Sequence, residues 1–293
     1  MLKISNLYKT YPPSIKALLD IKLEIGKGVF GLIGPNGSGK STLMRTISTL
    51  QEPDNGSIYF EDLNVLIQKH EMRQILGYLP QEFGVYPTVT AENLLNHLAV
   101  LKGVVDRKER KNHVSYLLEL TNLSEHRGKK LGGFSGGMKQ RFGIAQALLG
   151  NPKIIILDEP TAGLDPNERN RLYNVISELS ESITVILSTH IVADVEELCN
   201  NMAIINKGKI VSQVSPHDAI DSFKNKIWSK VVSSTEASLI SKKFNVISTK
   251  VQYGKVLLKI LHDEPPPGFD YVNPNLEDVY FSYTDSNKEI VQR

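Results

Sequence analysis

The chain has 293 residues, enough for one or two domains with a sizeable buried core. Apolar residues make up 41% and charged residues 23%, which is typical of a folded globular protein rather than a disordered one. The 34 Lys and Arg against 32 Asp and Glu leave a formal charge of +2, so the composition lacks the basic excess expected of a nucleic-acid-binding protein.

The sequence does not indicate secretion or a membrane span. A spanning helix needs about 20 mostly apolar residues, and the best candidate segments, 154–157 and 183–187, have the length of buried strands. Residues 1–6 lack the apolar core of a signal peptide. The single cysteine, Cys199, excludes an internal disulfide framework and fits a reducing cytosol. We therefore expect any membrane function to need a separate subunit that supplies the spans.

The first third of the chain predicts β structure that leads into a glycine-rich loop. The strand after the first glycine turn ends in further glycines and is followed by a helix pattern from Lys40, which together make the first half of a βαβ unit. Short strands, read from alternating or continuous apolar residues, are expected at 2–5, 18–25, 29–33, 57–60 and 75–78.

The middle of the chain predicts a helical insertion in an α/β domain. Apolar residues recur at helical spacing from about Thr90 to Ala147, and we place a helical subdomain at about 85–148. A parallel-sheet pattern then resumes at 154–157 and 184–188, on either side of a helix pattern.

The composition changes after Pro216. A strand is expected at 227–232, a helix at 235–244, a hairpin around Tyr253 and a last helix at 275–283. We therefore expect two parts, a domain at 1–215 and a small C-terminal α/β region at 216–293.

The glycine-rich loop at 34–41 has the phosphate-loop pattern, in which two glycines separated by four residues precede Lys-Ser. Its backbone N–H groups can surround a polyphosphate, Lys40 can bridge the β- and γ-phosphates, and the Ser41 hydroxyl can ligate Mg²⁺. The alternative is a turn that only starts a helix, and the flanking strand and helix favour a nucleoside triphosphate site. The residues predicted to bind ATP here are Gly34, Pro35, Asn36, Gly37, Ser38, Gly39, Lys40, Ser41 and Thr42.

Two carboxylates follow the apolar strand at 154–157. Ligands bind at the carboxyl edge of open α/β sheets, so Asp158 and Glu159 should lie beside the phosphate loop. Because neighbouring residues on a strand point in opposite directions, Asp158 can serve Mg²⁺ while Glu159 deprotonates the water that attacks the γ-phosphate. The alternative, solvated acids that cap a buried strand, explains one carboxylate better than two.

The segment 134–141, Phe-Ser-Gly-Gly-Met-Lys-Gln-Arg, resembles the signature sequence of ATP-binding cassette (ABC) proteins. The same family resemblance extends to Gln81, to Ala-Gly-Leu-Asp at 162–165 and to His190, in the family's order, and covers about residues 2–215. It implies a P-loop NTPase of α/β class, with a RecA-like core, an N-terminal antiparallel β subdomain and a helical subdomain, beside the small C-terminal α/β region.

The resemblance also implies a head-to-tail dimer with two ATP molecules between the subunits. Ser135, Gly136 and Gly137 would start a helix whose bare N–H groups form a second cradle for the γ-phosphate. In the family this cradle completes the site of the partner, and Asp165 reaches across the same interface. The alternatives are ordinary helix caps at Ser135 and at Asp165. We expect the partner cassette to be a second copy of this chain, and the alternative is a cassette on a different chain.

Three more residues take roles from the resemblance. Gln81 would touch Mg²⁺ and the attacking water, His190 would contact the γ-phosphate as a switch, and Tyr11 would stack on adenine. The alternatives are a surface turn for Gln81, a structural histidine at a strand end for His190, and Tyr8 in place of Tyr11.

These motifs imply an ATP-hydrolysing subunit of an ABC transporter, with ATP and Mg²⁺ as cofactors, on the cytoplasmic face of the membrane beside an integral membrane permease. Residues 81–93 resemble the permease-facing surface, and the alternative for them is a local lid over the helical subdomain. Residues 273–280 together with Met138 resemble bacterial drug and antibiotic exporters. The alternative is a soluble ABC ATPase that acts on ribosomes or DNA. Such proteins usually carry tandem cassettes or a long coiled-coil insertion, and the sequence shows neither, so no nucleic acid partner is expected.

Overall fold

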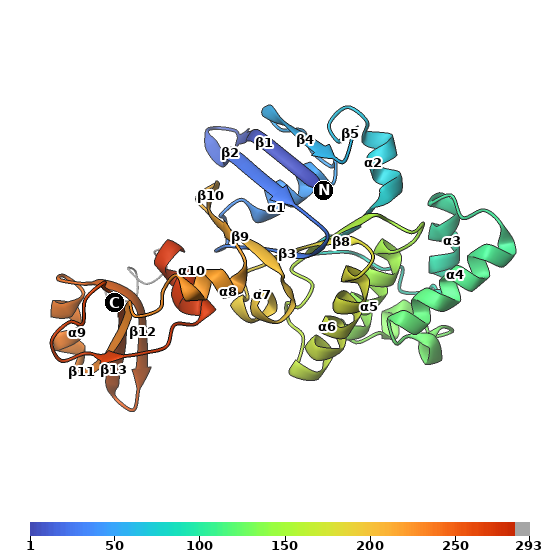
Figure 1. The fold of residues 1–293 in the computed structure, drawn as a ribbon. Coiled ribbons are helices and arrows are strands. Elements are labelled where there is room, and N and C mark those ends of the chain that lie inside the picture. Colours follow the sequence, from blue (N-terminus) through green and yellow to red (C-terminus); the bar gives the residue numbers. More distant parts are fainter. Residues whose placement is uncertain (285–293) are drawn as a thin grey trace.

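The computed structural model describes residues 1–284, so the end of the predicted C-terminal region, 285–293, lies outside the described residues. Alternating apolar residues near the N-terminus, such as Leu2, Ile4 and Leu23, form the buried face of an antiparallel sheet. This sheet lies at the top of the molecule in Figure 1. Its strands, in the order β2-β1-β4-β5, are β1 (Leu2–Tyr11), β2 (Ile15–Ile25), β4 (Asn55–Phe60) and β5 (Leu63–Asn64).

A second sheet of six strands forms the centre of the molecule, with the order β10-β9-β3-β8-β7-β6. All pairs are parallel except β10 with β9. Every residue of β7 and β8 is buried, as expected for strands covered on both faces. The strands are β3 (Gly28–Ile33), β6 (Leu76–Leu79), β7 (Ile154–Asp158), β8 (Thr184–Thr189), β9 (Asn201–Asn206) and β10 (Lys209–Val214).

Helices cover the two faces of this central sheet and divide the core. On one face Ile154, Ile156 and Ile186 join the cluster beneath the antiparallel sheet and α1, and on the other Ile155 and Leu157 join the cluster beneath the remaining helices. The covering helices are α1 (Lys40–Ile47), α2 (Lys69–Ile75), α5 (Gly136–Ala147), α6 (Pro166–Ser180) and α7 (Val192–Leu198).

The helical insertion lies at one end of the molecule in Figure 1. Helices α3 (Ala91–Leu101) and α4 (Arg107–Leu120) start at the capping side chains of Thr90 and Asp106, and two short 3₁₀ turns lead to α5. Among residues 1–284, no helix combines the length and apolarity needed to cross a membrane.

The C-terminal residues form a third sheet at the opposite end of the molecule (Figure 1), antiparallel, with the order β12-β13-β11-β14. The helix expected at 235–244 begins at a Ser233–Glu236 capping box and ends earlier, at Ile240. The elements are α8 (Pro216–Asp221), β11 (Ile227–Val232), α9 (Ser234–Ile240), β12 (Asn245–Gln252), β13 (Lys255–Leu261), β14 (Asp270–Tyr271) and α10 (Leu276–Thr284).

Helix α10 brings the chain back to the central domain. It packs against α7, α8 and β9, and one apolar cluster contains residues from both sides of the sequence boundary expected at 215. Within α10, the buried Asp278 carboxylate accepts both hydrogen bonds of Lys259 on β13, at 2.8 and 3.0 Å. The C-terminal region thus has its own sheet but shares a core with the first domain. The shared cluster includes Ile33, Val195, Met202, Ile204, Ile227, Ile247, Leu276 and Val279.

Candidate active site

The phosphate loop joins the end of β3 to the start of α1 and needs glycine for two reasons. Gly37 and Gly39 have φ of 77° and 110°, which favour a residue without a Cβ. At Gly34 the close neighbour is backbone, because a Cβ there would lie 2.2 Å from the carbonyl oxygen of Ile205. The glycines predicted from the motif are therefore required by the fold of the loop itself.

Lys40 at the start of α1 is buried, and its ammonium is held inside the loop. Nζ donates hydrogen bonds to the carbonyl oxygens of Gly34 at 2.6 Å and Pro35 at 3.2 Å, and lies 3.7 Å from Glu159 Oε1. Burial lowers the pKa of Lys40, while the charges of Glu159 and Asp158 act in the opposite direction. The Ser38 hydroxyl in the same loop is buried with no hydrogen-bond partner among the described residues, so it is free to donate to a phosphate.

Asp158 is the last residue of β7 and is 3% exposed. Burial raises the pKa of its carboxyl, and the hydroxyl groups of Ser188 and Ser41 oppose part of that rise. Its Oδ1 is buried and has no hydrogen-bond partner in the described chain. Asp158 lines one hollow with Ser41 and Gln81. This set of carboxylate, hydroxyl and amide oxygens suits Mg²⁺, which usually binds one or two carboxylates together with substrate phosphates.

Glu159 follows β7 with φ of 54°, a left-handed backbone conformation that is uncommon for glutamate. Strained backbone conformations of this kind cluster at functional sites. The Glu159 backbone N–H donates to the Ser188 carbonyl oxygen on β8 at 2.8 Å. Its carboxylate then lies between Lys40 and His190, with His190 Nδ1 at 2.5 Å from Oε2. The carboxyl edge of the sheet thus brings the predicted base and the predicted switch histidine into contact.

Tyr11, at the end of β1, lines the same hollow as the phosphate loop. Its hydroxyl donates to Gln51 Oε1 at 2.7 Å, and the Gln51 amide donates to the Thr42 carbonyl oxygen at 3.0 Å. Motif comparison missed Gln51, which has no local pattern of its own. The hollow has a volume of about 420 Å³ and is lined by residues that include Tyr11, Lys16, Asn36, Gly37, Gly39, Lys40, Ser41, Thr42, Gln81 and Glu159, and not by Tyr8.

The residues of the signature segment, and Asp165, lie outside the hollow around the phosphate loop. Ser135 caps α5 by accepting from Met138 N at 3.2 Å, and Asp165 caps α6 by accepting from Glu168 N at 2.9 Å. Neither they nor Gly136 and Gly137 line the hollow around the phosphate loop. Within one chain, the side chains of Ser135 and Asp165 therefore act as ordinary helix caps.

Glu168 connects these two helix starts, and the sequence did not indicate it. Its Oε2 lies 3.2 Å from the guanidinium of the buried Arg141 on α5, and its Oε1 accepts from Arg171 at 2.9 Å. A Cβ on Gly137 would lie 2.3 Å from Glu168 Oε2. A side chain at position 137 would therefore displace the Glu168 carboxylate from its place between α5 and α6.

Comparison with known proteins agrees with the geometry. The ABC transporter family model matches residues 18–162. The linearmycin resistance ATP-binding protein LnrL of Bacillus subtilis (strain 168) is 36% identical over 72% of this chain and 68% of its own length. The methionine import ATP-binding protein MetN of Helicobacter hepaticus is 34% identical over 80% of this chain and 68% of its own length.

Among solved structures, the ATP-binding cassette MJ0796, a dimer in a post-hydrolysis state with ADP and Pi, has a TM-score of 0.67 and 28% identity. The match covers 73% of this chain and 98% of that one. The fold expected from the sequence, a P-loop NTPase of the ABC type, is confirmed. The chain belongs to the ABC transporter family, as an ATP-binding protein with ATPase activity.

Proposed function

We propose that the chain powers a membrane transporter as one of two cassettes that close head to tail around two ATP molecules. The observation that carries this is the separation of the two anion-binding helix starts within one chain: the phosphate loop lies in the hollow with Glu159, and Ser135 with its glycines lies outside it. A second subunit is needed to bring Ser135 to the γ-phosphate. The MJ0796 cassette is itself a dimer, bound to ADP and Pi, which supports the pairing of two cassettes.

Each site would then use the residues of the hollow in separate roles. Lys40 and the loop N–H groups bind the phosphates, and Tyr11 stacks on the base. Mg²⁺ would be held by Asp158, Ser41 and Gln81, and it would neutralise part of the phosphate charge.

Glu159 takes the proton of the attacking water. Its position supports this role, because its carboxylate lies 3.7 Å from the Lys40 ammonium and is held in place by its contact with His190. Across the interface, Ser135, Gly136, Gly137 and Asp165 would complete the partner's site.

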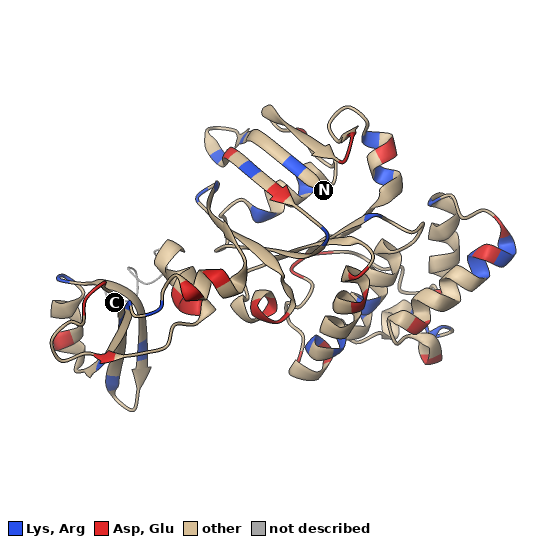
Figure 2. Cartoon of the chain, viewed as in Figure 1, with Lys and Arg blue, Asp and Glu red and all other residues tan. Residues whose placement is uncertain are grey.

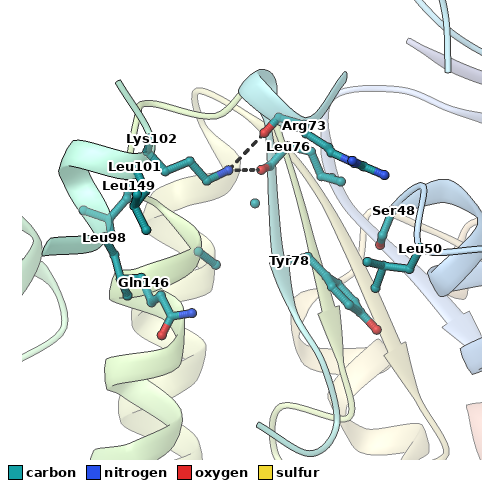
Figure 3. Close-up of a pocket in the computed structure, with 12 residues that line it drawn as sticks. Ser48, Leu50, Arg73, Leu76, Tyr78, Leu98, Leu101, Lys102, Gln146 and Leu149 are labelled. Atoms are coloured by element: carbon teal, nitrogen blue, oxygen red, sulfur yellow. Dashed lines mark hydrogen bonds between the residues drawn. The ribbon is translucent and has the colours of Figure 1, made fainter. Parts of the chain in front are cut away.

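A cavity of about 290 Å³ offers the place where a permease would dock (Figure 3). It lies between the edge strand β6, the residues after α1, and helices α3 and α5. Leu50 and Leu101 in its lining are 57% and 71% exposed, so apolar side chains border the opening of the cavity to solvent. Lys102 Nζ donates to the carbonyl oxygens of Arg73 and Leu76, and so ties the end of α3 to the start of β6.

The cavity shares lining residues with a neighbouring hollow beside the proposed Mg²⁺ ligands. Leu50 and Tyr78 line both, and the neighbouring hollow also contains Gln81, Glu82 and Asp158. A partner side chain in the cavity would therefore touch residues that border the Mg²⁺ ligands. The surface predicted at 81–93 meets this region only at its first residues, and the apolar lining comes from other segments.

Export is the direction we propose. The support is the resemblance of residues 273–280 to exporter ATPases and the similarity to LnrL, a resistance protein, although MetN, an import protein, is also a relative. Basic and acidic residues are mixed over the described chain in Figure 2, so nothing in the charge pattern favours the nucleic-acid alternative. The chain would act at the inner face of the membrane.

The docking proposal is tested by co-purification of the tagged chain from detergent-solubilised membranes. Leu101→Glu places a charge in the cavity and should abolish recovery of a polytopic membrane protein. Ile67→Glu places the same charge at an apolar residue that is 79% exposed and outside the cavity, and should leave recovery unchanged. Equal recovery with both variants would contradict docking at this cavity.

A further inference from the structure

Asp194 on α7 is a buried carboxylate for which the motifs give no role. It is 0% exposed and accepts hydrogen bonds from three hydroxyl groups. Thr161 Oγ1 lies 2.5 Å and Thr189 Oγ1 2.9 Å from Asp194 Oδ2, and the Tyr173 hydroxyl lies 2.6 Å from Oδ1. A buried charge is retained only when it is well satisfied, and three donors on one carboxylate meet that condition.

The three donors come from segments that are distant in the sequence. Thr161 is in the loop that runs from Glu159 to Asp165, and Thr189 is the last residue of β8, directly before His190. Both threonines bond to the same carboxylate oxygen, so this single atom joins the two loops that carry proposed active-site residues.

Further contacts make the junction rigid. The Thr189 hydroxyl also accepts from Ile191 N at 3.0 Å, which fixes the turn after His190. Tyr173 is on α6. Burial, and to a smaller extent the hydrogen bond to Asp194, raise the pKa of the Tyr173 hydroxyl, so this hydroxyl stays protonated and remains a donor. It bonds to the other carboxylate oxygen and ties the carboxylate to a helix rather than to either loop.

We propose that Asp194 is a positioning residue for ATP hydrolysis, whose Oδ2 locks the His190 turn to the loop after Glu159. The His190–Glu159 contact at 2.5 Å spans the same two segments, so its geometry depends on their alignment. A small displacement of a catalytic group reduces turnover strongly, whereas binding of ATP at the phosphate loop does not use this junction. The inference rests on the roles proposed above for Glu159 and His190.

The test uses steady-state ATPase kinetics of the full chain, with thermal unfolding in parallel. Thr161→Val removes one bond to Oδ2 and should lower kcat by about tenfold with KM for ATP unchanged. Thr161→Ser keeps the hydroxyl and should restore kcat. The matched control is Tyr173→Phe, which removes a bond to the same carboxylate from outside the two loops. It should lower the unfolding temperature by a similar amount and leave kcat near that of the wild type.

Equal loss of kcat in Thr161→Val and Tyr173→Phe would overturn the proposal, because both variants would then act through stability alone. An unchanged kcat in Thr161→Val, with turnover abolished in Glu159→Gln, would overturn the positioning role and leave the proposed base in place. Normal turnover in Glu159→Gln would overturn both assignments.

Discussion

The shared core of the two regions predicts that the chain unfolds as one unit, and Lys259→Met tests this. Lys259 on β13 pairs with the Asp278 carboxylate, and Asp278 also caps α10 by accepting from Asn275 N at 3.1 Å. Helix α10 carries Leu276 and Val279 into the cluster that contains Ile33, the residue before the phosphate loop. Methionine keeps the length and apolar stem of the lysine but removes its charge.

The magnitude follows from the burial of the pair. Asp278 is 2% exposed and Lys259 17%, so the substitution leaves an uncompensated buried carboxylate. Breaking a buried pair from one side costs about 3–5 kcal/mol, and the partial exposure of Lys259 places the expected loss near the lower end, about 3 kcal/mol. That corresponds to a fall in unfolding temperature of roughly 5–10 °C. Lys259→Met with Asp278→Asn should recover much of the loss, because no buried charge then remains unpaired.

Trp228 makes the assay specific, since it is the only tryptophan in the chain and lies on β11 of the C-terminal sheet. Its fluorescence follows unfolding of that sheet, while far-UV circular dichroism follows the whole chain. We expect both midpoints to fall together in Lys259→Met. Lys255→Met, at an exposed lysine on the same strand, should change the free energy of unfolding by less than about 0.5 kcal/mol. A fall in the fluorescence midpoint alone would refute the unfolding of the two regions as one unit. No change in either midpoint would refute the estimated loss of about 3 kcal/mol in the free energy of unfolding.

Three further predictions concern the site. The pKa of Asp158 is raised above its ordinary 3.8, mainly by burial, so the folded state holds this proton more tightly than the unfolded state does. The free energy of unfolding should therefore fall as pH rises from about 3.8 through the raised pKa. Asp158→Asn should remove that fall. It should also raise the free energy of unfolding by about 1 kcal/mol at neutral pH without nucleotide, measured by urea unfolding across pH. Gly137→Ala should cost about 1–3 kcal/mol because its Cβ meets Glu168, whereas Gly136→Ala, with no atom within 4 Å, should cost nothing in the same experiment. Tyr11→Ala should raise KM for ATP about tenfold with kcat little changed, and an unchanged KM would contradict stacking on the base.

The sequence was informative where one continuous segment makes the geometry. A strand that ends in glycines and continues as a helix makes the phosphate loop, so residues 34–41 could be identified from their spacing alone. The same holds for Asp158 and Glu159, because a buried parallel strand can deliver its last residues only to the carboxyl edge.

Contacts between distant segments could not be predicted in this way. Asp194 has the appearance of an ordinary acidic residue in a helix, and only the sheet order places Thr161 and Thr189 beside it. Glu168 and Gln51 were missed for the same reason. The return of α10 to the central domain was also missed, because the change in composition near Pro216 signals a new sheet and carries no information on what that sheet packs against.

The most direct test of the proposed function is the mass of the Glu159→Gln chain in solution by light scattering, with Mg-ATP and then with Mg-ADP. Loss of the base should leave ATP bound and uncleaved, so we expect a mass of two chains with Mg-ATP and one chain with Mg-ADP. Lys40→Ala, which loses the phosphate contact, should remain a single chain with either nucleotide. A single chain with Mg-ATP, in a Glu159→Gln protein shown to have bound the nucleotide, would contradict ATP-driven pairing of the cassettes.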